Sequence, residues 1–395
     1  MDPVRLLLIS TTAVLSLMLL IEWNQYSDEY QKQQSDLYSA AIAEPLMLGD
    51  ETAGTPLSGG LDEGIPSVNQ EASPLAVFLD DSETFTLSTD TLNLVISADG
   101  GDVVSASLPK FPVRLDAPDQ PFRLLENNSL RRYVAQSGLI GPDGIDASGN
   151  RARYASQGLT NNGDGSHTLT LAWTGNDPLG LQVYKRFSAY DDRYDVDVSF
   201  DIRNGGRSVA SITSFAQLKR DNTQAPDGNT GFGVSPYLGA ALTQPDERYT
   251  KLSFSDLGDG PFSKRLPAGW VAILQHYFVS AWIPSQQTSH DYFASQLSNG
   301  DNVIGYKNQN VDIAPGSATT ITQTLYVGPK DQVVLADLAK YLDLVIDYGW
   351  LWWLAKPLFL LLTLIQQFVI NWGLAIIALT VIVKLVFFRL SAASY

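Results

Sequence analysis

Two long apolar runs, one near each end, most constrain what this chain can fold into. The first, Leu6 to Ile21, contains no charged residue. The second, Trp350 to Leu390, is about 40 residues long and contains three cations and no acid. An α-helix of about 20 mostly apolar residues crosses the hydrocarbon of a bilayer. Both runs therefore predict membrane segments, and the polar chain between them must fold outside the bilayer.

The N-terminal run predicts a signal anchor over residues 1–26. Arg5 precedes the run, acids follow it, and the bulky residues after it offer no nearby small-x-small cleavage site. We expect the anchor to remain uncleaved, with a cleaved signal peptide as the alternative. By the positive-inside bias, Arg5 places the N-terminus in the cytoplasm and the following chain on the outer side.

Residues 27–83 predict a tether between the anchor and the next domain. This segment contains twelve acids and one lysine, together with several prolines and paired glycines. It shows no sustained period of 2.0 or 3.6 residues. Such a composition is typical of a disordered, self-repelling chain. We assign it no binding role.

Alternation with a period of two dominates residues 84–346. From Tyr194 to Arg203, five apolar residues alternate with five polar ones, which predicts a strand with one buried and one wet face. Further strand candidates are Leu92–Ile96, His167–Trp173 and Thr320–Val327, with glycine-rich turn signals between the candidates. Many strands without long helical patterns predict an all-β antiparallel sandwich of two sizeable sheets. The fold class is thus an all-β outer domain joined to α-helical transmembrane segments.

Helical spacing returns at the end of this domain. Val334, Leu338, Leu342 and Val345 fall on one stripe of a 3.6-residue helix. The spacing predicts a C-terminal helix that packs against the sandwich or bridges it to the membrane.

Aromatic residues are concentrated in one stretch of the same domain. Trp270, Tyr277, Phe278 and Trp282 lie within a strand-like segment. We expect them to form strand core, with a ligand platform as the alternative.

Composition excludes several classes of function. The net charge of −16 disfavours a nucleic-acid partner. The absence of cysteine removes disulfides, thiolate metal sites and cysteine nucleophiles. Three histidines without metal-ligand spacing make a histidine-ligated metal site improbable. The sequence also lacks a nucleophile elbow and a Walker-type phosphate loop, and Gly100-Gly101 predicts a hairpin turn. We therefore predict no catalytic residue, metal or cofactor.

A carbohydrate site is the alternative function for the middle domain. Large sandwiches can host sugar enzymes that use a histidine with a carboxylate, and His276 is the residue that this hypothesis selects. A lone histidine beside aromatic residues is more often a hydrogen-bonded packing residue. The hypothesis predicts an open pocket with His276 beside a carboxylate.

Residues 347–371 predict an amphipathic helix in the membrane interface. At 100° per residue, Lys356, Thr363, Gln367 and Asn371 fall on one side of this helix. Indole rings favour headgroup depth, and we place there the side chains of Trp350, Trp352, Trp353 and Trp372. A second spanning helix is the alternative.

Residues 372–390 predict a transmembrane helix. These 19 residues would be about 28 Å long, which matches the hydrocarbon thickness. The helix would deliver Arg389 to the cytoplasmic boundary, in agreement with the orientation from Arg5. Lys384 would then lie within the cytoplasmic leaflet, where burial of a charge costs about 2.5–3.5 kcal/mol on insertion scales. Either its long stem reaches the headgroups, or it faces a wet cavity open to the cytoplasm and attracts acidic parts of a passing polypeptide.

This order of parts resembles the YidC family of bacterial membrane-protein insertases, and the resemblance covers essentially the whole chain. Its most specific motifs are Asp347-Tyr348-Gly349-Trp350-Leu351-Trp352 and Asn371-Trp372-Gly373. The other motifs that carry it are Gly100-Gly101-Asp102-Val103, Gln136-Ser137-Gly138-Leu139, Ser214-Phe215-Ala216-Gln217-Leu218-Lys219, Gly269-Trp270-Val271-Ala272, Ala281-Trp282-Ile283-Pro284 and Leu342-Asp343-Leu344.

The resemblance implies a function without covalent catalysis. It implies a periplasmic supersandwich domain and a core helix whose cation lies in a hydrophilic groove open to the cytoplasm and the lipid. Lys384 occupies that position, where the family commonly has arginine, so the charge remains but the bidentate donor does not. The implied partners are nascent inner-membrane proteins, the Sec translocon with its accessory subunits, and the lipid bilayer. The implied location is the bacterial inner membrane, with several membrane passes and a large periplasmic domain.

One departure from the family concerns the C-terminus. The family continues after this span with a cytoplasmic hairpin and further membrane helices that complete the groove, whereas only residues 391–395 follow here. We expect the chain to be a fragment, inactive alone as an insertase, with a second polypeptide that supplies the remainder as the alternative. A periplasmic chaperone or scaffold domain whose aromatics bind unfolded chains is compatible with either case.

Overall fold

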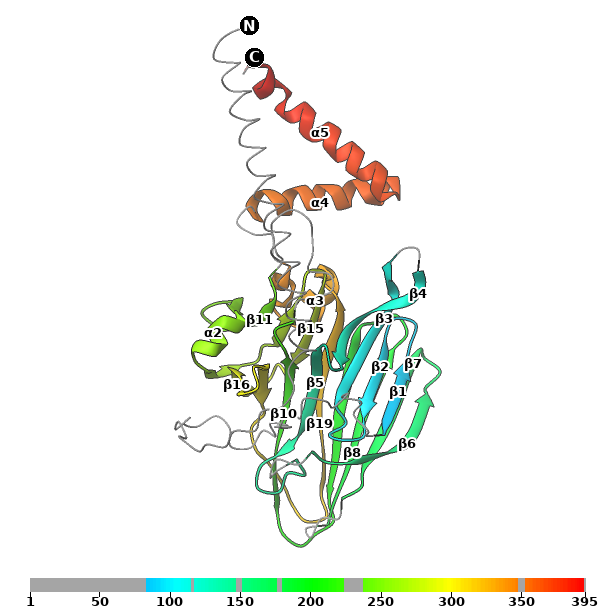
Figure 1. The fold of residues 1–395 in the computed structure, drawn as a ribbon, viewed down its shortest axis with the longest axis vertical. Helices are drawn as coiled ribbons and strands as arrows, with labels where there is room; N and C mark the ends of the chain where they lie inside the picture. Colours follow the sequence, from blue (N-terminus) through cyan, green and yellow to red (C-terminus); the bar gives the residue numbers. More distant parts are fainter. Residues whose placement is uncertain are drawn as a thin grey trace, which may run out of the picture. The chain divides into compact units, whose positions relative to one another are not determined.

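A computed structural model describes residues 83–114, 117–146, 151–175, 180–223, 237–346 and 352–393 (Figure 1). The predicted anchor 1–26 and the predicted tether, apart from its last residue, lie outside the described residues. The domain boundaries predicted from the sequence stay predictions.

Two antiparallel sheets form the main body of the described chain. The larger sheet has ten strands, in the order β1 (Thr84–Ser88), β2 (Asn93–Ser97), β3 (Val103–Arg114), β4 (Ala117–Asn127), β5 (Arg132–Ile140), β10 (Ala210–Arg220), β17 (Asn302–Lys307), β16 (Ser289–Gln296) and β13 (Phe262–Pro267), with β18 (Val311–Ile313) paired to β10. The second sheet has nine strands, in the order β12 (Thr250–Leu252), β11 (Gly239–Leu242), β14 (Val271–Leu274), β15 (Phe278–Ile283), β19 (Ala318–Pro329), β9 (Asp195–Asn204), β8 (Leu181–Tyr190), β7 (Ser166–Trp173) and β6 (Tyr154–Asn161). The predicted antiparallel sandwich is confirmed.

Alternating burial shows why these segments form strands. On β9, Val196, Val198, Phe200 and Ile202 are at most 1% exposed, and polar residues alternate with them. Each buried side chain of this size contributes about 1.5–3 kcal/mol relative to an exposed one. The period-two pattern therefore identified both the strand and its buried face.

The expected turn at Gly100-Gly101 is confirmed. The two glycines join β2 to β3 with φ angles of 76° and 58°, a left-handed conformation that favours glycine. Trp270 and Trp282 are buried, as expected. The expectation for Tyr277 is wrong, because it lies in the turn between β14 and β15 and its side chain is 58% exposed.

One continuous helix was predicted at the C-terminal end of the domain, and this prediction is wrong. The structure has α3 (Gln332–Leu338) followed by the short 3-10 helix η2 (Leu342–Val345). Tyr341 adopts a φ of 69° between them, which interrupts the helical path. Leu335, Leu342 and Val345 pack into one buried cluster with the strands, so both short helices dock on the sandwich. A further helix, α2 (Phe254–Asp259), is capped at its start by Ser253.

Two long helices follow the sandwich in the sequence. They are α4 (Trp352–Val369) and α5 (Trp372–Ala393). Ile370 ends α4 with a φ of 57°, and the Asn371 side chain accepts a hydrogen bond from the Leu374 amide at 3.1 Å. The placement of Asn371 on the polar side of the first helix is therefore wrong, because this residue caps the start of α5 instead. No helix in the described part of the chain meets the combined length and apolarity needed to be identified as a membrane span.

Candidate functional site

The predicted cation Lys384 lies on α5, and its side chain is exposed. Apolar side chains surround it on the helix: Val381, Leu385 and Phe388 are 51%, 69% and 67% exposed. A helix in water normally turns such residues toward a core. Lys384 therefore interrupts a surface whose composition suits lipid or another protein segment.

The predicted membrane-interface residues are placed only in part. Trp372 is the first residue of α5, and its side chain is 52% exposed. The structure describes the backbone but not the side chains of four others, which are Trp352, Trp353 and Lys356 on α4 and Arg389 on α5. Trp350 lies entirely outside the described residues. The roles assigned to these residues stay predictions.

The three histidines are distributed among separate places. The His276 ring stacks on Tyr277 with centroids 3.8 Å apart. His167 contacts the Asp191 carboxylate at 3.0 Å, and His290 is buried with its Nε2 atom 2.8 Å from the Ser285 carbonyl oxygen. The sugar-binding role of His276 stays a prediction. Among the described residues, no group of His, Asp and Glu could hold a metal ion.

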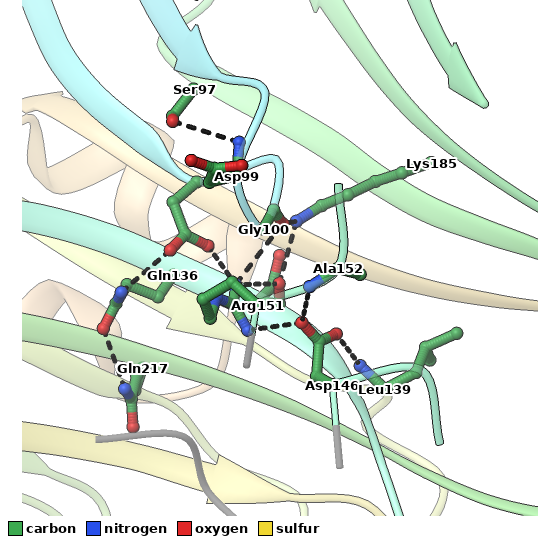
Figure 2. A network of polar contacts seen from close by, with 12 residues as sticks. Ser97, Asp99, Gly100, Gln136, Leu139, Asp146, Arg151, Ala152, Lys185 and Gln217 are labelled. Atoms are coloured by element: carbon green, nitrogen blue, oxygen red, sulfur yellow. Dashed lines mark hydrogen bonds and ion pairs between the residues drawn. The ribbon is translucent and has the colours of Figure 1, made fainter. Parts of the chain in front are cut away.

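A buried polar network connects the two sheets, and Figure 2 shows its members. Arg151 donates from Nη1 to the Asp146 carboxylate at 3.0 Å and from Nη2 to the Asp102 carboxylate. The same Nη2 atom donates to the Ser137 carbonyl at 3.0 Å. Asp146 also accepts the backbone N–H of Leu139 and of Ala152, both at 2.9 Å. One guanidinium thus joins two carboxylates that are each held by a second set of donors.

The network continues along the larger sheet through two glutamines. Gln136 on β5 donates to Asp102 at 2.8 Å, and Gln217 on β10 donates to Gln136 at 2.9 Å. Asp146 and Arg151 lie in the connection between β5 and β6, which belong to different sheets. The network therefore fixes the point at which the chain passes from one sheet to the other.

Lys185 on β8 brings the second sheet into the network. Its amine donates to the carbonyl oxygens of Gly100 and Ser137, both at 2.9 Å, and the side chain is fully buried. The rings of Phe187 and Phe200 lie beside the amine, with centroids 5.4 and 5.1 Å away. Burial lowers the pKa of Lys185 to about 7, with an attraction to Asp102 that opposes the shift.

The pKa of Arg151 shifts in the opposite direction to that of Lys185. Burial opposes its charge, but Asp102 and Asp146 outweigh burial and raise the pKa of the guanidinium above its ordinary value. Arg151 is therefore the permanent cation of the network, and Lys185 is the group whose charge responds to pH near neutrality.

Glycines make room for these side chains. A Cβ atom on Gly100 would lie 2.3 Å from Nε of Arg151, and one on Gly138 would lie 2.4 Å from a carboxylate oxygen of Asp146. Such separations are impossible without movement of the network. Both glycines belong to motifs that carry the family resemblance, as do Asp102, Gln136 and Gln217.

The arrangement serves cohesion rather than a reaction. Its four charged groups are buried and hydrogen-bonded to backbone or side-chain partners, and a substrate has no access to the fully buried Lys185 amine in this conformation. Removal of one partner from a buried ion network is strongly destabilising. The network thus holds the two sheets and their connection in one geometry.

Sequence reasoning missed the charged members of this network. Lys185 occupies an inward position on β8, in the alternation Leu181, Val183, Lys185, Phe187 and Ala189. A lysine at a core position of a strand is a detectable signal, because a buried amine needs partners. The identity of those partners is not encoded in the local pattern.

Comparison with known proteins places most of the chain in one family. Residues 84–361 match the family model described as the YidC periplasmic domain. The membrane protein insertase YidC of Marinomonas sp. (strain MWYL1) is 40% identical over the whole of this chain, which covers 71% of that relative. The membrane protein insertase YidC of Pseudomonas entomophila (strain L48) is 39% identical, again over the whole chain, with 70% of the relative covered.

Solved structures give a more distant likeness. A galactose mutarotase related enzyme from Lactobacillus acidophilus aligns with 62% of this chain and 97% of its own length, at 12% identity and a TM-score of 0.43. A putative aldose 1-epimerase from Escherichia coli K12 aligns with 62% of this chain and 98% of its own length, at 12% identity and a TM-score of 0.37. Likeness at this level assigns no function to this chain.

Proposed function

The chain belongs to the YidC family of membrane protein insertases, and from that premise we propose that Lys384 is the cation that receives substrate segments during insertion. The family implies nascent membrane proteins as substrates, the lipid bilayer as surroundings, and the bacterial inner membrane as location. We further propose that α4 lies in the outer interface of that membrane, that α5 crosses it, and that the sandwich faces the periplasm.

The observation that carries this proposal is the surface of α5. Lys384 is an exposed cation among exposed apolar side chains, including Leu385 and Val386 at 69% and 67%. An ammonium group in hydrocarbon is costly unless water or a partner reaches it. A hydrated groove beside α5 would satisfy the amine and would also lower the cost of moving a polar substrate tail.

The chemistry of an ammonium group defines the substrate preference. A point charge attracts carboxylates of a translocated tail without the fixed geometry of a guanidinium. Apolar substrate helices would slide along the exposed face of α5 into lipid while their short polar tails remain hydrated near Lys384. No nucleotide, metal or covalent intermediate enters this proposal. We also propose that the complete insertase works either without or with the Sec translocon.

Insertion assays with Lys384 variants test the proposal. The complete insertase that contains this chain would be produced in cells depleted of their own insertase, with two substrates that differ only in acidic or neutral residues of the translocated tail. We expect Lys384→Ala to reduce insertion of the acidic-tail substrate about tenfold, the equivalent of ~1.4 kcal/mol. Lys384→Arg should retain insertion, because the charge remains.

Leu385→Ala is the matched control, since it removes a neighbouring exposed side chain without a change of charge. We expect it to change insertion of the acidic-tail and neutral-tail substrates to the same extent, because it removes no charge. Normal insertion of the acidic-tail substrate by Lys384→Ala, at equal protein levels, would refute the role of this amine.

A further inference from the structure

The corner between α4 and α5 contains a strained residue, and we call residues 370–375 the elbow. α4 ends at Val369 and α5 begins at Trp372, so Ile370 and Asn371 alone connect the two helices. Figure 1 shows the helices meeting at this corner without a loop. Ile370 adopts a φ of 57°, a conformation that is rare for a β-branched residue. Such strain persists only where the surrounding structure enforces it, and it is concentrated at functional sites.

The hydrogen bonds of the two helices meet at Ile370 and Asn371. The N–H of Ile370 donates to the Gln366 carbonyl at 2.7 Å and completes α4. On the next residue, the Asn371 carbonyl accepts the N–H of Ala375 at 3.0 Å, and the side-chain oxygen accepts the N–H of Leu374 at 3.1 Å. An N–H in the first turn of a helix has no partner within the helix, so the Asn371 side chain supplies a partner that alanine could not. The hydrogen bonds of α4 thus end where those of α5 begin, which leaves no residue between them as a free hinge.

Ala375 shows that the elbow is packed as well as capped. This residue is fully buried, whereas Leu374 and Ile376 on either side of it are 55% and 53% exposed. α4 contacts α5, so the covered side of α5 is the side that faces α4. A small side chain lets two helices in a membrane approach closely. The cap at Asn371 and the packing at Ala375 therefore restrain the same corner.

A small change of angle at the elbow moves Lys384 by a large distance. Lys384 follows Asn371 by thirteen residues, which corresponds to about 20 Å along the axis of α5. A rotation of α5 by about 20° at the elbow would therefore displace Lys384 by about 7 Å. Opposite charges influence each other strongly within about 4–6 Å. The angle at the elbow thus decides whether the Lys384 amine meets a substrate carboxylate at a given place in the membrane.

We propose that Asn371 is a positioning residue for Lys384. The cap that Asn371 forms fixes the angle between α4 and α5, and this angle sets the place of the Lys384 amine. The left-handed conformation of Ile370 turns the chain from the first helix into the second. The inference deepens the proposed function and rests on it, since Lys384 must be the cation that receives substrate segments.

The first test measures the angle at the elbow, and the absence of native cysteine allows it. The whole chain would carry spin labels at Leu360→Cys on α4 and Val386→Cys on α5, where the native residues are 58% and 67% exposed. After reconstitution in vesicles of phosphatidylcholine and phosphatidylglycerol, pulsed dipolar spectroscopy would give the distribution of distances between the two labels. We expect Asn371→Ala to make this distribution at least about twofold broader. Asn371→Asp and Asn371→Ser should leave it as narrow as in the parent, because both residues also cap helices.

Two further variants show which feature of the elbow holds the angle. Gln367→Ala is the matched control, because Gln367 is an exposed polar residue inside α4, four residues before Asn371. It should keep the narrow distribution. Ile370→Gly should also keep it, since glycine adopts a left-handed φ readily and the cap remains. An unchanged distribution in Asn371→Ala would overturn the inference. Equal broadening in Asn371→Ala, Asn371→Asp and Asn371→Ser would overturn it as well, because the cap would then not be the cause.

The second test asks whether Asn371 acts through Lys384. The complete insertase that contains this chain would carry Asn371→Ala, Lys384→Ala or both, and would be assayed with the acidic-tail and neutral-tail substrates. We expect Asn371→Ala to reduce insertion of the acidic-tail substrate about threefold, and the double variant to insert it no worse than Lys384→Ala alone. The neutral-tail substrate should be inserted nearly as by the parent.

The two tests separate this inference from the proposed function. Losses that multiply in the double variant, or an equal loss for both substrates, would overturn the positioning role, because Asn371 would then act independently of the amine. Normal insertion of the acidic-tail substrate by Lys384→Ala would instead refute the proposed function and, with it, the positioning of a substrate-binding amine. The distances between the spin labels would still decide whether Asn371 fixes the elbow, since that measurement requires no substrate.

Discussion

Two lysines of this chain experience opposite surroundings. Lys185 is fully buried between the sheets, with two carbonyl acceptors, two aromatic rings and a nearby Asp102–Arg151 ion pair. Lys384 is exposed on α5 among exposed apolar side chains. The fold itself satisfies the first amine, whereas the second one depends on a partner or solvent outside the described chain. The comparison separates a charge that stabilises the structure from one that is available for function.

Arg151→Met should show the largest effect on the buried side of this comparison. The substitution leaves the carboxylates of Asp102 and Asp146 buried without their shared cation. Loss of one partner from a buried ion network costs about 3–5 kcal/mol. The measurement is the free energy of unfolding of the whole chain in detergent, from denaturant titrations followed by tryptophan fluorescence.

The matched control for Arg151 is Arg265→Met. Arg265 makes two hydrogen bonds to Asp291 at 2.7 and 2.8 Å, but the two side chains are 63% and 44% exposed. An exposed ion pair adds little to stability because water screens it, so this variant should unfold nearly as the parent does. Equal destabilisation by the two variants would contradict this comparison. It would show that burial does not determine how much a paired arginine contributes to the free energy of unfolding.

The second prediction concerns pH and Lys185. Between about pH 7 and the ordinary lysine value near 10.5, the unfolded chain binds one proton at this residue that the folded chain does not. The free energy of unfolding should therefore rise with pH in this window, by up to about 1.4 kcal/mol per pH unit. Burial raises the pKa of tyrosines such as Tyr154, and their ionisation in the unfolded chain opposes this rise near pH 10, so the useful range is pH 7 to 9.

Two methionine variants isolate that slope. Lys185→Met should remove most of the pH dependence between pH 7 and 9, whatever its effect on absolute stability. Lys384→Met should leave the slope in place, because Lys384 contacts none of the network residues. A slope that survives in Lys185→Met would show that another group titrates in this range, and the pH response would then belong to that group rather than to the network.

The sheets could be predicted from the sequence, but the network could not. Alternation along β9 and β8 specifies which residues point inward, because side chains of a strand alternate between its two faces. It therefore places Lys185 in the core. Its acceptor Gly100 lies 85 residues earlier and on the other side of the sandwich. Contacts of that kind depend on how the two sheets pack together. The period-two pattern of a single strand does not specify that packing.

Two helical predictions failed because one residue in each segment adopts a left-handed backbone conformation. A helical wheel placed Asn371 on the polar side of the first long helix, but that helix ends at Val369, before the left-handed φ of Ile370. Tyr341 interrupts the helix predicted across Val334 to Val345 in the same way. A β-branched or aromatic residue rarely adopts this conformation, so the sequence offers no local signal for either break.

The smallest of the three effects compares two glycines with nearly the same backbone. Gly100 has a φ of 76° and lies against Arg151, whereas Gly163 has a φ of 79° and has nothing within 4 Å of an added Cβ atom. Alanine at either position pays for a left-handed φ, about 1–2 kcal/mol. Gly100→Ala must also displace the guanidinium, and we expect about 1–3 kcal/mol of further destabilisation from that overpacking. Equal unfolding free energies of Gly100→Ala and Gly163→Ala would mean that the network yields easily. The surroundings of the buried Lys185 amine would then depend on the two aromatic rings beside it rather than on the neighbouring Arg151–Asp102 ion pair.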